Sequence, residues 1–320
     1  MDFDFSPDQY ALRDEARRFL EQQCPTSHVR EFIDDPVGWS RPLWKQMADL
    51  GWMALPFPEG AGGLGQSFLD LVLLLGELGR AVAPVPFLSS VAQAGQVVMR
   101  HGSDDQRARL LPGIASGARI ATVALDQAAL SANGVEARKD GSVWRLDGEH
   151  RFVVDAPAAD LLVVAATTSD GDRWFVTEAG APVTPKRSFD LTRTMGSVSF
   201  DGTEAEALER PGLQPALNVC VAAACAEMLA DLEPSRSAAY YAGWAVATDA
   251  ADADLAVSVA KSFGSEALAR VAAEGVQVHG GIAFTWEHDM HLYQKRIKSM
   301  EALFGDEACH RERIAKIAGL

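Results

Sequence analysis

Residues 142–176 are SVWRLDGEHRFVVDAPAADLLVVAATTSDGDRWFV, and this stretch decides the fold. The β-type runs of this region and its flanks lie at 122–125, 142–146, 151–154, 161–166, 173–176 and 197–200. Turn signals such as Asp147-Gly148 and Asp170-Gly171-Asp172 separate them and leave no room for helices. Runs this short and closely spaced predict an antiparallel sandwich or barrel, not a parallel sheet of βαβ units.

On both sides of this stretch the pattern is helical. Ser6-Pro7 predicts a cap before a helix at 8–23, whose apolar residues repeat at helical spacing. Further helices are expected at 42–50, 67–78, 89–100, 103–112, 216–232, 235–251, 252–279 and 287–301, with a glycine-rich loop at 58–65. The expected fold class is therefore α+β and multi-domain. It has an N-terminal helical domain (1–118), a central antiparallel β domain (119–208) and a C-terminal helical bundle (209–320).

The composition excludes several classes of function. The 320 residues are 48% hydrophobic, which is ample for a core, and they carry a net charge of −15. A chain this acidic is repelled by nucleic-acid phosphates and anionic lipid, so neither a nucleic acid nor a membrane is an expected partner. The acidic start of the chain does not resemble a secretory signal, and its apolar runs are too short to span a bilayer. Because Cys24, Cys220, Cys225 and Cys309 lack metal-binding spacing, we expect a cytoplasmic protein without a metal site.

One further stretch is more specific than the fold class. Residues 277–289 are QVHGGIAFTWEHD, a helix end followed by two glycines and an aromatic-rich turn. Four other segments accompany it along the chain, at 6–14, 51–80, 146–160 and 190–193. In this order and over nearly the whole chain, the five segments resemble the acyl-CoA dehydrogenase family.

The resemblance implies a cofactor and a reaction. Enzymes of this family remove the α-proton of an acyl-CoA thioester with a glutamate while the β-hydride passes to FAD, and they are typically tetramers. By resemblance, Gln277, Gly280 and Gly281 are cofactor-binding residues that approach the ADP part of a flavin held by a neighbouring subunit. A glutamine can bond adenine or ribose, and glycines let backbone N–H groups reach pyrophosphate. The alternative is that the two glycines only form a tight turn between helices.

The position of the catalytic base departs from the family. Counted from the glycine motif, the family glutamate corresponds to Phe304, which cannot accept a proton. Asp306 lies two residues further along and is the candidate for a displaced base. The alternative interpretation of Asp306 is a solvated acid near a helix start. Apart from that candidate, no catalytic residue is expected in this chain.

The expected flavin contacts depart as well. Residues 124–127 are ALDQ where the family has a Thr-Glu-Pro segment near the flavin ring. The strand whose hydroxyl contacts the flavin appears here as Phe152-Val153-Val154, and valine has no hydroxyl. The Arg-x-Gln-Phe-Gly flavin motif of the family is missing after Cys225. Glu227 and Glu233 are the acids of this shortened region, where surface charges are the plainer interpretation.

Together with the retained motif, these departures resemble the short subunit of heteromeric (α2β2) actinobacterial steroid-CoA-type acyl-CoA dehydrogenases. The hypothesis is an oxidoreductase acting on CH–CH bonds, in which a larger subunit supplies the base and holds most of the FAD. The substrate would be an acyl-CoA, with a steroid side-chain CoA as one candidate, and an electron-transfer flavoprotein or similar acceptor would take the electrons. Two alternatives stay open. One is a self-sufficient enzyme with a base at Asp306, Glu301 or Glu227, and the other is a flavin-free acyl-CoA-binding or scaffold protein.

Overall fold

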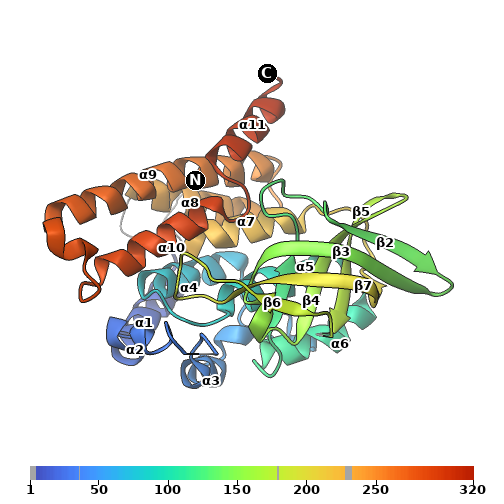
Figure 1. Cartoon of the computed structure of the whole chain (residues 1–320), viewed down its shortest axis with the longest axis horizontal. Helices are drawn as coiled ribbons and strands as arrows, with labels where there is room; N and C mark the ends of the chain where they lie inside the picture. The colour runs from blue at the N-terminus through green and yellow to red at the C-terminus, as the bar shows by residue number, and fades with distance from the viewer. Residues whose placement is uncertain (1–4, 36, 179, 228–232) are drawn as a thin grey trace.

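A computed structural model describes residues 5–35, 37–178, 180–227 and 233–320. Helices from the two ends of the chain pack together in one part of the molecule, and a β-sheet forms the other part (Figure 1). The sheet comes from the middle of the chain, so the helical, β and helical segments follow one another as expected. The expected fold class is therefore confirmed, while the exact domain boundaries stay a prediction.

The N-terminal helices begin where the sequence places its caps. They are α1 (Pro7–Gln23), α2 (Thr26–Glu31), α3 (Arg41–Asp49), α4 (Phe68–Arg80), α5 (Gly95–His101) and α6 (Asp104–Ala115), with short 3-10 turns η1 (Trp52–Ala54) and η2 (Glu59–Ala61). The π-helix η3 (Leu88–Ala94) leads directly into α5. The Ser6, Ser67 and Ser103 side chains each accept a hydrogen bond from the backbone N–H three residues on, in a reciprocal capping box. The predicted starts of these helices are confirmed. They could be predicted because a helix cap involves residues that are close in sequence.

Two helix ends differ from the sequence prediction. The helix expected to stop at Gly79 continues to Arg80, and α6 runs through Pro112 and Gly113 to Ala115. A glycine costs about 1 kcal/mol inside a helix and a proline about 3 kcal/mol, relative to alanine. In both helices the side chains near the break, including Leu78 and Ile114, are buried in the core, and tertiary packing overrides the local preference.

The sheet has seven described strands. They are β1 (Ala121–Ala124), β2 (Val135–Asp140), β3 (Val143–Val154), β4 (Leu161–Thr168), β5 (Gly171–Glu178), β6 (Val183–Pro185) and β7 (Met195–Ala207). Their order is β1-β4-β2-β3-β7-β5, with β6 on β7. Neighbours are mostly antiparallel as expected, but β1 and β2 both pair with β4 in parallel. The two runs expected at 142–146 and 151–154 form the single long strand β3, which is interrupted by bulges.

Strand β4 explains how the sheet is attached to the helices. Leu161, Val163 and Ala165 point into a core shared with the helices of both chain ends. The alternate residues Leu162 and Val164 point into a second core on the other face of the sheet. Because both faces are covered, residues 161–166 of this strand are all apolar and show no polar alternation.

The C-terminal helices include the longest element of the described chain. They are α7 (Ala216–Glu227), α8 (Glu233–Ala247), α9 (Ala253–His279), α10 (Met290–Ala302) and α11 (Glu307–Ala318), with the turn η5 (Gly280–Phe284) between α9 and α10. The helix expected at 287–301 begins only at Met290. In Figure 1, α9 lies along an outer edge of the molecule and α11 projects from its body. The residues expected to extend α7, 228–232, lie outside the described part of the chain.

Candidate functional site

The retained glycine motif lies on the surface at the end of α9. Gln277 is exposed on the last turn of the helix, and Gly280 follows with a φ of 65° and a ψ of −147°, a conformation that favours glycine. Gly281 is also exposed, and a Cβ added at either glycine would meet no atom within 4 Å. The backbone here is open to a large group from outside the chain.

Phe304, which lies at the position counted as that of the family's catalytic glutamate, is buried. Phe304 follows α10 in a left-handed conformation, with a φ of 57°, and only 1% of it is exposed. Its backbone N–H donates to Gln127 Oε1 at 3.1 Å, and its carbonyl accepts from His310 Nε2 at 2.8 Å. Both backbone groups are therefore bonded to side chains of this chain.

Asp306 lies two residues beyond Phe304 and caps a helix. Its carboxylate accepts a hydrogen bond from the backbone N–H of Cys309 at 2.9 Å, at the start of α11. The residue is exposed, which agrees with the alternative of a solvated acid at a helix start. The other candidates for a relocated base give no stronger geometry: Glu301 pairs with Lys298 at 2.7 Å, and the side chain of Glu227 lies outside the described residues, as does that of Glu233.

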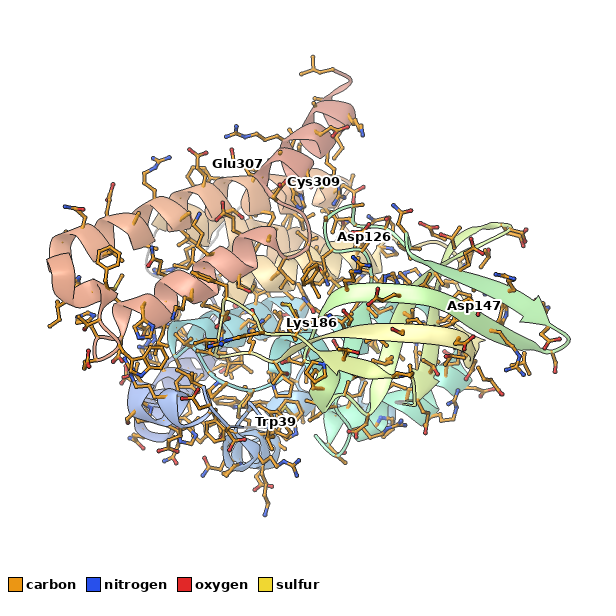
Figure 2. The ribbon with its side chains drawn as sticks, in the orientation of Figure 1. Trp39, Asp126, Asp147, Lys186, Glu307 and Cys309 are labelled. Carbon is orange, nitrogen blue, oxygen red and sulfur yellow. The ribbon has the colours of Figure 1, made fainter. Side chains whose placement is uncertain are left out.

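The loop after β1 folds back on itself beside this turn. Asp126 Oδ1 accepts from the backbone N–H groups of Ala128 and Ala129 at 3.1 and 3.2 Å. Figure 2 shows Asp126 near the start of α11, where Glu307 and Cys309 lie, in agreement with the Gln127–Phe304 hydrogen bond. Asp126 and Gln127 thus accept hydrogen bonds from the backbone of this chain.

A cavity of about 800 Å³ lies between the loop after β1, strand β3 and the end of α10. Asp126, Gln127, Phe152 and Leu303 line it, so three segments that the sequence comparison treated separately meet here. Phe152 sits at a bulge of β3 with a φ of 58° and is 60% exposed. The Gln277 motif is not part of this cavity, because α10 separates η5 from Leu303.

Buried polar groups fix the end of α10 next to the cavity. Lys261 of α9 is fully buried, and its Nζ donates to the carbonyls of Met300 and Glu301 at 2.8 and 3.0 Å. Burial lowers the pKa of this amine. On the opposite side Arg296 Nε donates to Asp190 Oδ2 at 2.6 Å, which ties the 190–193 segment to α10.

The histidines around the site are buried and neutral in character. His310 has no exposed surface, and burial lowers its pKa to about 4. His150 lines the cavity and donates from Nε2 to the carbonyl of Ala165 at 2.7 Å, and burial lowers its pKa as well. Because a carbonyl only accepts hydrogen bonds, both rings carry the proton on Nε2.

Sequence reasoning missed Lys261, His310 and the role of Gln127. A signal existed for Lys261, since it falls on the same buried helical face as Val257 and Leu268. No comparable signal exists for the Gln127–Phe304 contact, which joins residues 177 positions apart. It depends on how the sheet packs against α10.

The family resemblance implies FAD, and the positions it assigns to the flavin ring do not fit that group here. Asp126 and Gln127 bind backbone atoms of their own chain, and Val154 offers no hydroxyl. The exposed glycine turn at 280–281 does fit, because it leaves space for a pyrophosphate brought by another chain. When bound, FAD would accept a hydride from the substrate.

The described residues form neither a metal-binding cluster nor a membrane-spanning helix. In that part of the chain no three His, Cys, Asp or Glu side chains come close enough to share a metal ion. The rings of His279 and His288 lie 4.9 Å apart, but no third ligand joins them. No described helix combines the length and the apolar character that crossing a bilayer requires.

Comparison with known proteins gives consistent matches over both helical segments. The family model for the acyl-CoA dehydrogenase N-terminal domain matches residues 6–118, and that for the acyl-CoA dehydrogenase C-terminal domain matches residues 210–319. Acyl-CoA dehydrogenase IpdE2 of Mycobacterium tuberculosis is 30% identical over 315 residues, 89% of either chain.

Two solved structures are similar along their whole length, each with a TM-score of 0.89 and 26% identity. One is the Tcur3481-Tcur3483 steroid ACAD G363A variant, for which 98% of both chains is covered. The other is the ChsE4-ChsE5 complex from Mycobacterium tuberculosis, for which 100% of this chain and 99% of that chain is covered.

Proposed function

The chain belongs to the acyl-CoA dehydrogenase family, and we propose that it is a subunit of an FAD-dependent acyl-CoA dehydrogenase that lacks its own catalytic base and completes the site of a partner subunit. The reaction is the α,β-desaturation of an acyl-CoA thioester. In this proposal the partner supplies the glutamate and most of the flavin pocket. This chain supplies Gln277, Gly280 and Gly281, which contact the ADP part of the partner's FAD.

The observation that carries this proposal is the buried turn at Phe304. A general base needs a titratable group within reach of the substrate proton, and position 304 holds a buried phenyl ring. The nearby acid Asp306 is used as a helix cap. The residues that would hold a flavin ring in this chain instead bind its own backbone, so the loss involves several contacts together.

An apolar outer face supports the presence of a partner. Large apolar side chains are exposed along α9 and the turn that follows it. They are Val259, Phe263, Val271, Val278, Ile282, Phe284 and Trp286. Exposed apolar side chains gathered on one helix and its following turn are typical of a protein–protein contact, and this protein otherwise carries a net charge of −15. We assign it to a larger acyl-CoA dehydrogenase subunit in an α2β2 assembly.

The substrate and the electron acceptor are proposed from relatives. One similar structure is described as a steroid ACAD and another as a complex of two differently named chains. We therefore propose a steroid side-chain CoA as the acyl substrate. Electrons would leave the reduced flavin to an electron-transfer flavoprotein or a similar acceptor, as the family resemblance implies.

The visible absorption spectrum tests the proposal. The chain is purified alone, and also co-expressed with a full-length acyl-CoA dehydrogenase homologue from the same genome. Flavin absorption in the co-purified complex, and none on the chain alone, is the expected result. Stoichiometric flavin and full activity on the lone chain would replace the proposal with a self-sufficient enzyme. A complex that forms without flavin would replace it with a scaffold protein.

A further inference from the structure

The N-terminal helix α2 makes a polar contact with the start of α10. Asp289 accepts from Thr26 Oγ1 at 2.6 Å and from Arg30 Nε at 2.8 Å. Arg30 also donates from Nη1 to the carbonyl of Trp286 at 2.7 Å. Residues about 260 positions apart in the chain therefore meet directly beside the turn that follows α9. We call this set, Thr26, Arg30, Asp289 and Trp286, the α2 latch.

The indole of Trp286 is fixed by its neighbours. The Arg30 guanidinium lies 5.8 Å from the ring centroid, and Lys295 Nζ lies 5.2 Å from it. The ring also stacks on His291, with centroids 4.9 Å apart and planes 18° apart. Although partial burial alone would raise it, the bonds from Thr26 and Arg30 hold the pKa of Asp289 below its usual value. The Asp289 carboxylate is therefore ionised at neutral pH.

The rest of the turn makes few contacts with the body of the molecule. Val278 is 84% exposed and Phe284 is 75% exposed, and Ala283 is the buried side chain of η5. The two glycines add backbone freedom, which makes ordering this segment costly. The latch fixes the chain just after the turn, so it limits the backbone conformations that Gly280 and Gly281 can adopt.

We propose that Thr26, Arg30 and Asp289 are positioning residues that hold the 277–281 motif in the orientation needed to bind the cofactor of the partner subunit. This inference rests on the proposed function. A preorganised turn binds more tightly than a free one because the entropy cost of ordering is paid during folding. The latch touches neither the cofactor nor the substrate, and it acts through the backbone of residues 286–289.

The test measures FAD affinity in the co-purified complex. The complex is freed of FAD and titrated with FAD, and flavin fluorescence and the visible spectrum are followed. Asp289→Asn keeps the shape of the side chain and removes its charge, and Arg30→Met removes the guanidinium. Each variant is expected to raise the Kd for FAD about tenfold, with little change in kcat at saturating FAD. The double variant is expected to match the single ones, because both remove the same contact.

Asp249→Asn is the matched control. Asp249 also pairs with an arginine of another helix, Arg100, at 3.1 Å, but it lies outside the turn. This control is expected to keep the wild-type Kd for FAD. An unchanged Kd in both latch variants would overturn the positioning role, as would an equal loss in the Asp249→Asn control. A wild-type complex without flavin would instead overturn the proposed function, and it is detected before any variant is made.

Discussion

The turn at Phe304 shows how single residues close a site. Its N–H and its carbonyl are bonded to Gln127 and His310, and its side chain is buried. Burial holds His310 neutral and outweighs the hydrogen bond from Nε2 to that carbonyl, which favours the charged ring. The Nδ1 atom lies buried without a partner among the described residues. The stability of the turn therefore depends on the protonation state of one ring.

Replacing His310 with glutamine is expected to reduce the acid sensitivity of the fold. The pKa of His310 is about 4 in the folded chain and 6.5 when exposed, so the unfolded chain binds more protons between these pH values. Stability falls as the pH drops through this window, by about 2 kcal/mol from this residue between pH 7 and pH 5. Urea unfolding at the two pH values measures the loss, which should be about 2 kcal/mol smaller in His310→Gln. The exposed His279→Gln is the control, and an identical pH dependence in both variants would contradict the assignment.

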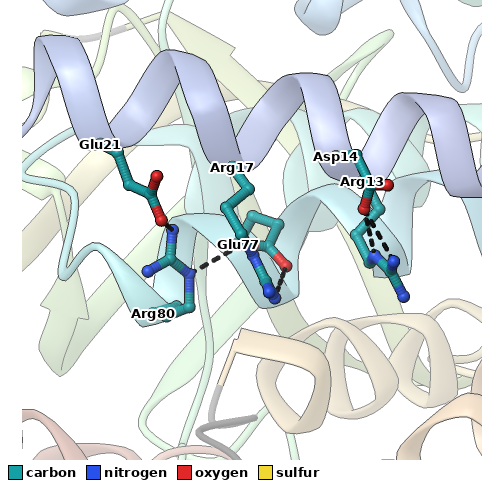
Figure 3. Close-up of polar contacts among 6 residues, drawn as sticks. All are labelled: Arg13, Asp14, Arg17, Glu21, Glu77 and Arg80. Carbon is teal, nitrogen blue, oxygen red and sulfur yellow. Dashed lines mark hydrogen bonds and ion pairs between the residues drawn. The ribbon is translucent and has the colours of Figure 1, made fainter.

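At the scale of elements, α1 is docked on α4 by a buried carboxylate. Glu77 accepts from Arg17 Nη2 at 2.7 Å and from Arg80 Nε at 2.9 Å, while Arg80 also reaches Glu21 at 3.2 Å (Figure 3). Burial alone would raise the pKa of Glu77, but the two arginines hold it below its usual value. One carboxylate thus accepts hydrogen bonds from two guanidinium groups and joins the two helices.

Glu77→Gln is expected to lower the free energy of unfolding by about 1–3 kcal/mol, because Arg17 loses its counter-charge at a partly buried site and Arg80 keeps only its pair with Glu21 among the described residues. Urea unfolding at neutral pH measures this change. Asp14→Asn is the control in α1, since Asp14 is exposed and pairs with its neighbour Arg13 (Figure 3). Its effect should stay within about 0.5 kcal/mol. A loss in Glu77→Gln no larger than in Asp14→Asn would refute the docking role.

Lys261 provides a second prediction at this scale. Lys261→Met keeps the length of the side chain but leaves the carbonyls of Met300 and Glu301 without this donor. The expected loss of stability is about 2–4 kcal/mol, measured by urea unfolding. Lys298→Met removes a half-exposed ion pair on α10, and it should cost less than about 1 kcal/mol. Equal losses in the two variants would argue against a stabilising role for the hydrogen bonds from Lys261 to the end of α10.

Elements could be predicted from the sequence as far as their determinants are local. The starts at Ser6, Ser67 and Ser103 followed from capping boxes, which involve residues three positions apart. The helix through Pro112 could not be predicted, because the burial of Ile114 decides it. The family segments also pointed to Phe304 and Gln277, and the roles assigned to these two positions stay predictions. The cavity lined by Gln127 and the end of α10 depends on tertiary packing, and no local sequence pattern predicts it.

At the scale of the whole molecule, the apolar face on α9 predicts where association can be broken. Phe263→Glu places a charge between Val259 and Val271 on this face, and Phe263 is 45% exposed. The Kd for the larger subunit is expected to rise at least tenfold, because a desolvated charge in an interface has no partner. Sedimentation velocity of the mixed subunits measures the Kd.

The control for this prediction is Leu50→Glu, which changes an equally exposed apolar residue (51%) at the end of α3. It should leave association unchanged. Both variants should keep the unfolding free energy of the single chain within about 0.5 kcal/mol, as is usual for surface positions. A complex that tolerates Phe263→Glu would mean that the partner binds elsewhere.

The closed turn at Phe304 also bears on evolution. A glutamate placed at this position alone would enter the buried core, so it would lower stability before it could remove a proton. Under the proposed function, Gln127 and Val154 would also have to change before a base at this position could act, so a single substitution would not reverse the loss of the base. Under the proposed function, the genes of the two subunits are then inherited as a pair, because neither product can return to independence by a single mutation.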